Sequence, residues 1–121
     1  MRICIDLDGT ICDFRREGET FADVRVKPGA AEMIRGYRAQ GHTVVINTAR
    51  NMGSQGHNLG KVMKNVGALT FKWLDDNGIE FDEIFFGKPN ADITIDDRTV
   101  RFEDNWGEMT EEFLASIAKK E

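Results

Sequence analysis

The feature that most constrains the fold of this chain is a short hydrophobic segment near its start that ends in two aspartates. Residues 2–7 (RICIDL) are mostly aliphatic or β-branched and stop at an Asp-Gly break, which predicts a β-strand. Asp6 and Asp8 are two positions apart, and in an extended chain such residues point to the same side. Two carboxylates held side by side repel each other unless a cation or a proton lies between them. The pair therefore indicates a cation site, although an ordinary Asp-Gly turn after a strand fits the same residues equally well.

The rest of the chain alternates between hydrophobic runs and helical patterns. Further strands are predicted at residues 42–47, 83–86 and 93–95, and helices between Pro28-Gly29 and Gly41, at residues 61–76 and from an N-cap at Thr110. This order predicts an α/β protein with a single Rossmann-like, doubly wound parallel sheet and flanking helices. Only six residues separate the last two predicted strands, whereas a parallel crossover normally needs about a dozen or more. Either that connection is an unusually direct loop or one of the two strands is misplaced.

The length of 121 residues fits one domain, residues 1–121, and is too short for a core plus a separate domain that caps a substrate. Apolar residues make up 40% and charged residues 31% of the chain, which is typical of a soluble globular protein. Residues 9–27 carry mixed charges around Gly18. We predict that they form a flap outside the core, with a hairpin turn near Glu17-Gly18.

Charge, hydropathy and cysteine usage narrow the possible functions. The formal net charge is −5 and no tract is rich in lysine and arginine, so duplex nucleic acid is not expected as the main partner. The longest apolar runs are far shorter than a membrane span. Two cysteines make no disulfide framework, and Cys4, inside the first predicted strand, is expected to be a buried, reduced thiol. Because the N-terminus leads directly into a strand, we expect no secretory leader and a cytoplasmic protein.

Four polar clusters follow predicted strands. They are DLDGT at residues 6–10, NTAR at 47–50, GKP at 87–89 and DDR at 96–98. Because the carboxyl ends of parallel strands lie at one edge of a sheet, where such folds bind ligands, the four clusters are expected to converge.

The residue types in these clusters suit phosphoryl transfer. The paired aspartates at 6/8 and 96/97 offer the hard oxygen ligands that Mg²⁺ prefers. One carboxylate can attack phosphorus, and a second can protonate the leaving alkoxide and later deprotonate water. Thr48 and Lys88 supply a hydroxyl and a positive charge for the phosphoryl oxygens. On its own, a Thr after a strand is usually a capping residue, and a single Lys is usually a surface residue. Found together at strand ends, they predict a phosphate-binding site.

The order DxDGT, a strand ending in Thr, a Lys, and a strand ending in Asp-Asp resembles the four signature motifs of the haloacid dehalogenase (HAD) superfamily. The resemblance extends from Arg2 to Arg98. It implies a HAD-like fold without a cap domain and a magnesium-dependent phosphatase. The implied roles are Asp6 as nucleophile, Asp8 as general acid and base, Thr48 and Lys88 as phosphoryl ligands, and Asp6, the carbonyl of Asp8, Asp96 and neighbouring Asp97 around Mg²⁺.

Further segments resemble a subgroup of small HAD proteins described as capsular polysaccharide biosynthesis phosphatases. They are TARNM at 48–52, NLGK at 58–61 and WLDDNGIEFDEIFFGKP at 73–89. A capless site is open, so the resemblance implies that the flap, the loop at residues 50–61 or a neighbouring subunit of a homo-oligomer sets specificity. The expected substrate is a small phosphorylated metabolite, a sugar or polyol phosphate.

Substrate contacts are predicted around the first and second motifs and in the loop that follows. The candidates are Gly9, Thr10, Ala49, Arg50, Asn51, Asn58 and Lys61. Arg50 can fork onto a second anionic group of the substrate, or instead form a salt bridge to the acidic cluster. Lys61 begins a predicted helix, whose N-terminus favours anions, but it is equally an ordinary surface lysine.

Other functions fit parts of the same pattern. A phosphatase of nucleotides or polynucleotide ends uses the same motifs on another substrate. A receiver-like phospho-acceptor domain also has this length and uses Asp, Thr and Lys around Mg²⁺, but it needs its phosphorylated Asp after the third strand, and no Asp follows the strand end at Phe86-Gly87. A catalytically silent metal-binding scaffold is the third alternative, and the four intact motifs argue against it.

Overall fold

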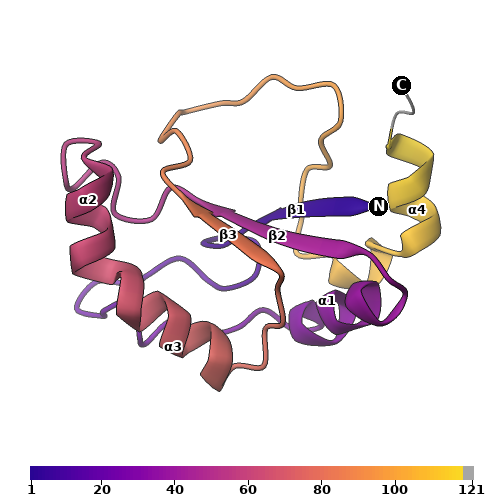
Figure 1. Cartoon of the computed structure of the whole chain (residues 1–121), viewed down its shortest axis with the longest axis horizontal. Coiled ribbons are helices and arrows are strands. Elements are labelled where there is room, and N and C mark those ends of the chain that lie inside the picture. The colour runs from indigo at the N-terminus through magenta and orange to yellow at the C-terminus, as the bar shows by residue number, and fades with distance from the viewer. Residues whose placement is uncertain (119–121) are drawn as a thin grey trace.

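The computed structural model describes residues 1–118, and its centre is a parallel sheet of three strands (Figure 1). The strands are β1 (Arg2–Asp6), β2 (Thr43–Thr48) and β3 (Glu83–Phe86), in the order β1-β2-β3. Ile5 pairs with Ile46, and Ile46 with Ile84. The strands predicted at residues 2–7, 42–47 and 83–86 are therefore confirmed to within one residue at each end.

The helices also follow the predicted order. They are α1 (Ala30–Ala39), α2 (Leu59–Val62), the π-helical η1 (Met63–Gly67), α3 (Ala68–Asp76), the 3₁₀ turn η2 (Trp106–Glu108) and α4 (Glu111–Ile117). The helix predicted at 61–76 is the succession of α2, η1 and α3. Thr110 is the N-cap of α4, as predicted, and its side chain accepts the Phe113 amide. Within residues 1–118, no helix has the length and apolar character needed to cross a membrane.

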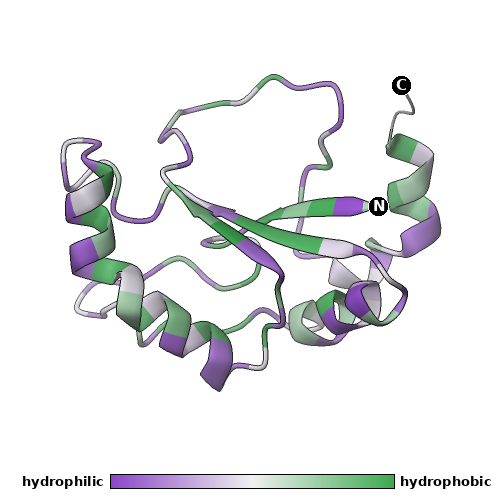
Figure 2. Cartoon of the chain, in the orientation of Figure 1, coloured by the Kyte–Doolittle hydropathy of each residue, from purple (hydrophilic) through white to green (hydrophobic). Residues whose placement is uncertain are grey.

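The hydrophobic core lies on one face of the sheet. Ile5, Val44 and Ile46 point to this face and pack with Tyr37 of α1 and Leu74 of α3. Figure 1 shows α1 and α3 on the same side of the strands, and Figure 2 shows the strands as mainly hydrophobic. The Rossmann-like α/β fold, with one parallel sheet, flanking helices and no cap within residues 1–118, is thus confirmed, and both of these crossover helices lie on one face.

The opposite face of the sheet carries Cys4, Val45 and Phe85, because residues paired in register point to the same side. Cys4 is exposed, and 52% of the Phe85 surface is accessible. The prediction that Cys4 is buried was therefore wrong. The side-chain alternation of β1 points this thiol away from the core helices, to a face that neither α1 nor α3 covers.

The flap prediction for residues 9–27 is only partly correct. The turn near Glu17-Gly18 is present and exposed. The base of the segment, however, belongs to the core, because Ile11 and Val24 are buried there. The indole Nε1 of Trp73 donates to the carbonyl of Val24 at 2.8 Å and fixes the base of the flap to α3.

The strand predicted at residues 93–95 is absent. Residues 87–105 form an arch without helix or strand. It first passes over the side of the sheet opposite α1 and α3 (Figure 1), and its end returns to the core, where Val100 and Phe102 pack. Ile93 and Ile95 are 80% and 95% exposed. A parallel neighbour of β1 would have to begin at the far end of the sheet, and the six residues after Phe86 span at most about 20 Å. The short connection noted in the sequence therefore marks a misplaced strand.

Substitutions of two isoleucines, one buried and one exposed, test this arrangement. Replacing Ile46 with alanine should lower the free energy of unfolding by about 2–5 kcal/mol, because its side chain is fully buried in the sheet. Replacing Ile95 with alanine should change it by less than about 0.5 kcal/mol, because the side chain is exposed. Urea unfolding of both variants makes the comparison. If Ile95→Ala lowered the free energy of unfolding as much as Ile46→Ala, the arch would have to be part of the sheet.

Candidate active site

A tight turn after β1 places the two aspartates of the first motif. The carbonyl of Leu7 accepts the amides of residues 10–12 at 2.9–3.2 Å, which folds the chain back directly behind Asp8. Gly9 within this turn has φ +87°, and a Cβ there would lie 2.4 Å from the ring of Phe14. The positive φ is what favours glycine at this position, because the exposed ring of Phe14 can move aside.

Asp6, the predicted nucleophile, lies beside the predicted phosphate-binding lysine. Its Oδ1 is 3.2 Å from Nζ of Lys88, and the hydroxyl of Thr10 lies 3.4 Å from its Oδ2. The amide of Lys88 donates to the carbonyl of Thr48, so the lysine is anchored at the end of β2. The side chains of Asp6 and Lys88 are each about one third exposed. The topology thus brings the first and third motifs together at an accessible edge of the sheet, as expected.

Asp8 is held by Arg50 in a two-pronged ion pair. Nε of Arg50 donates to Oδ2 at 3.0 Å and Nη2 donates to Oδ1 at 2.7 Å. The Arg50 side chain is fully buried, whereas that of Asp8 is 17% exposed. Of the two roles considered for Arg50, the salt bridge to the acidic cluster is the one observed, and a buried guanidinium offers no surface for the predicted substrate contact.

Thr48 lies at the end of β2 as predicted, but it is 1% exposed. Its hydroxyl oxygen accepts the amide of Arg50 at 3.0 Å. The hydroxyl therefore shapes the turn that leads into Arg50, through half-buried Ala49. Its predicted contact with a phosphoryl group stays a prediction.

The other predicted substrate contacts lie in the loop before α2 and at its start. Asn58 caps α2, because its Oδ1 accepts the amide of Lys61 at 3.0 Å, and both residues are exposed. Oδ1 of Asn51 accepts Nδ2 of Asn65 at 2.8 Å, and Asn51 has φ +65°. These contacts are local to the loop and its helix, and none of them reaches the two aspartates of the first motif.

The structure does not bring Asp96 and Asp97 to the first motif. Both are exposed on the arch, and Asp96 accepts the amides of Asp97 and Arg98 at 2.6 and 3.4 Å. The first of these bonds is the main reason that the pKa of Asp96 is lowered. Within residues 1–118, no three His, Cys, Asp or Glu side chains are grouped as metal ligands.

The described residues therefore do not assemble the predicted set of magnesium ligands around one point. Both carboxylate oxygens of Asp8 accept from Arg50, and Asp6 is the more exposed carboxylate of the two. The predicted ligand Asp96 would have to approach from the arch. The physical reason is the missing fourth strand, which was expected to carry Asp96 to the same edge of the sheet as Asp6.

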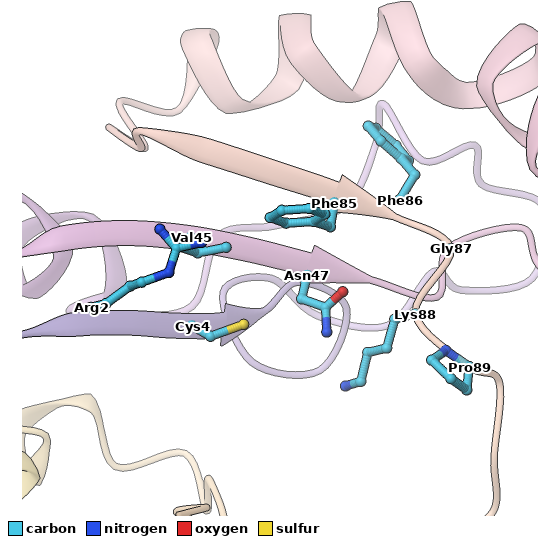
Figure 3. A pocket seen from close by; sticks show the side chains of 9 residues that line it. All are labelled: Arg2, Cys4, Val45, Asn47, Phe85, Phe86, Gly87, Lys88 and Pro89. Carbon is cyan, nitrogen blue, oxygen red and sulfur yellow. The ribbon is translucent and has the colours of Figure 1, made fainter. Parts of the chain in front are cut away.

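An open hollow lies beside Lys88 on the face of the sheet that carries Cys4 (Figure 3). It measures about 380 Å³, and its lining residues are Arg2, Cys4, Val45, Asn47, Phe85, Phe86, Gly87, Lys88 and Pro89. Figure 3 shows Asn47 and Lys88 near each other where β1 and β2 end. Apart from Lys88, no predicted site residue lines this hollow, although Cys4 and Asp6, two positions apart in β1, point to the same side of the sheet.

Three residues that the sequence did not single out surround the Asp8–Arg50 pair. Nη1 of Arg50 donates to Oγ1 of buried Thr70 at 3.1 Å, and the guanidinium carbon lies 4.4 Å from the ring centroid of Phe21. The thiol of Cys12 lies 3.5 Å from Oδ1 of Asp8. Burial and the nearby charge of Asp8 raise the pKa of Cys12 to about 12. A polar Thr70 within the buried stripe of α3 is the one signal that could have revealed this cluster.

Comparison with solved structures identifies the class of fold. The chain superposes on a D,D-heptose bisphosphate phosphatase from B. bronchiseptica, crystallised with magnesium and phosphate, with a TM-score of 0.51 and 21% identity. The match covers 77% of this chain and 54% of that one. This likeness shows that the chain shares the α/β fold of that phosphatase.

A second solved structure has a much greater similarity over nearly the full length. It is a structural-genomics target protein from Vibrio cholerae, with 32% identity, a TM-score of 0.84 and coverage of 97% of this chain and 96% of that chain. The chain therefore belongs to the same family as this V. cholerae protein. No protein-family model matches the chain. A search of curated proteins likewise gives no match.

Proposed function

We propose that the chain is a phosphomonoesterase that hydrolyses a small phosphorylated metabolite through an aspartyl-phosphate on Asp6. The observation that carries this proposal is the 3.2 Å approach of Asp6 Oδ1 and Lys88 Nζ at the accessible end of β1. A carboxylate with an adjacent fixed cation can attack phosphorus while the ammonium group neutralises charge on the transferred group. Asp8, two residues further on, provides the second carboxylate that the reaction needs.

The reaction has two steps and requires Asp8 to enter it protonated, on an oxygen lone pair that does not accept from Arg50; Asp8 first gives and then regains this proton. In the first, a carboxylate oxygen of Asp6 forms a bond to phosphorus as the bond from phosphorus to the leaving oxygen breaks, and that oxygen takes the proton from Asp8. In the second, water attacks the phosphorus of the aspartyl-phosphate and Asp8 takes its proton. The bond between Asp6 and phosphorus then breaks and releases orthophosphate.

The proposed substrate class is a sugar or polyol phosphate. The hollow beside Lys88 has a size suited to such a molecule, and Asn47 places an amide there that can hydrogen-bond a hydroxyl. The name of the B. bronchiseptica neighbour and the resemblance to capsular polysaccharide biosynthesis phosphatases support the same class. A phosphate-release screen over sugar, polyol and nucleotide monophosphates separates this class from the nucleotide alternative.

We also propose that the reaction depends on Mg²⁺. Mg²⁺ commonly binds through one or two carboxylates, with water and substrate phosphate completing its shell. Asp6 and the carbonyl of Asp8 are the candidate ligands at the end of β1. Asp96 would join them only if the arch moved toward β1.

Replacing Asp6 with asparagine should lower phosphate release from p-nitrophenyl phosphate by at least about a thousandfold, because the amide cannot act as the nucleophile. Asp75→Asn, an exposed change on α3, is the matched control and should keep wild-type turnover. Near wild-type activity in Asp6→Asn would refute the nucleophile assignment. A chain that accepts one phosphoryl group from acetyl phosphate but does not turn over p-nitrophenyl phosphate would be receiver-like instead.

Removal of divalent metal should abolish turnover, and added Mg²⁺ should restore it. If Asp96 approaches the site, Asp96→Asn should raise the Mg²⁺ concentration needed for half-maximal activity by about tenfold. Asp92→Asn, another exposed carboxylate of the arch, should leave that concentration unchanged. Magnesium titrations of the three proteins provide the test. Full turnover in EDTA would contradict metal dependence.

A further inference from the structure

The guanidinium of Arg50 has a partner at every nitrogen. Nε and Nη2 donate to the two oxygens of Asp8, and Nη1 donates to Thr70. Nη2 also lies 3.7 Å from Sγ of Cys12. Because the Arg50 side chain is fully buried, these contacts fix the orientation of the planar group from all sides.

Asp8, the partner of this guanidinium, is by contrast accessible from the site. The side chain of Asp8 is 17% exposed and lies two residues after Asp6, on the turn that follows β1. A two-pronged bond to a rigid fork sets the plane of a carboxylate as well as its position. The direction in which Asp8 faces the site is therefore determined by Arg50, a residue that itself has no access to it.

A flap residue completes the cluster. The ring of Phe21 lies against two guanidinium groups, with its centroid 4.4 Å from the guanidinium carbon of Arg50 and 5.4 Å from that of Arg15. Phe21 also packs against the small hydrophobic cluster of Met52 and Val62. The flap thus covers the face of Arg50, which links the position of the flap to that of Asp8.

We propose that Arg50 is a positioning residue that aligns Asp8 for proton transfer to the leaving group, held in place by Thr70 and by Phe21 of the flap. This inference rests on the proposed phosphatase reaction. Its consequence is selective, because proton donation matters most when the leaving oxygen is strongly basic. Misalignment of Asp8 should therefore slow the hydrolysis of esters with poor leaving groups. It should have little effect on the hydrolysis of esters whose leaving group departs as a stable anion.

The positioning role can be tested with two aryl phosphate esters of similar size that differ in their leaving group. Values of kcat/KM are measured for phenyl phosphate, which has the poorer leaving group, and for p-nitrophenyl phosphate. In Arg50→Lys, which keeps the charge but loses the fork, kcat/KM for phenyl phosphate should fall at least about tenfold more than for p-nitrophenyl phosphate. Arg38→Lys, which changes a surface arginine paired with Asp82, should leave the ratio of the two values unchanged.

Two milder variants keep the test decisive if Arg50→Lys fails to fold. Thr70→Val and Phe21→Leu leave the ion pair intact but remove one support of Arg50, and each should shift the ratio in the same direction by a smaller factor. Equal losses for both esters, or no change in the ratio, would overturn the positioning role and leave Arg50 a structural residue. Absence of wild-type phosphate release from both esters would instead overturn the proposed function, and the positioning role with it.

Discussion

The ion pair between Asp8 and Arg50 is the contact on which the arrangement of the site depends. It joins the segments that follow β1 and β2, and through Thr70 and Phe21 it also binds α3 and the flap. Removing one partner of a buried ion pair leaves an uncompensated charge and typically costs about 3–5 kcal/mol. The same contact leaves Asp6 as the more exposed carboxylate of the two, so the two aspartates lie in different environments.

Local patterns were sufficient to predict the three strands that form the sheet and the helices that cover it. The strands β1, β2 and β3 are short hydrophobic runs that end at polar residues, and the apolar spacing of α1 places Ile34 and Tyr37 in the core. Because parallel strands share an edge, the approach of Asp6 and Lys88 also followed from the sequence. Each of these features depends on neighbours in the chain or on a general rule of sheet topology.

The features that could not be predicted depend on contacts between distant segments. A β-branched run such as Ile93–Ile95 reads as a strand wherever it occurs, but it needs a connection long enough to reach a partner. The burial of Ile11 and Val24 depends on the core that Trp73 helps to form. Arg50 was equally compatible with a substrate contact or a salt bridge, and only the fold supplies Thr70 and Phe21 to decide between them.

The central claim is that Asp6 carries the phosphoryl group during turnover, and trapping the intermediate tests it most directly. The protein is mixed with p-nitrophenyl phosphate, quenched in acid during steady turnover and analysed by peptide mass spectrometry. The account predicts one added phosphoryl group on the peptide that contains Asp6, and its loss after treatment with hydroxylamine, which cleaves acyl phosphates. A phosphoryl group on another residue during turnover would contradict the account.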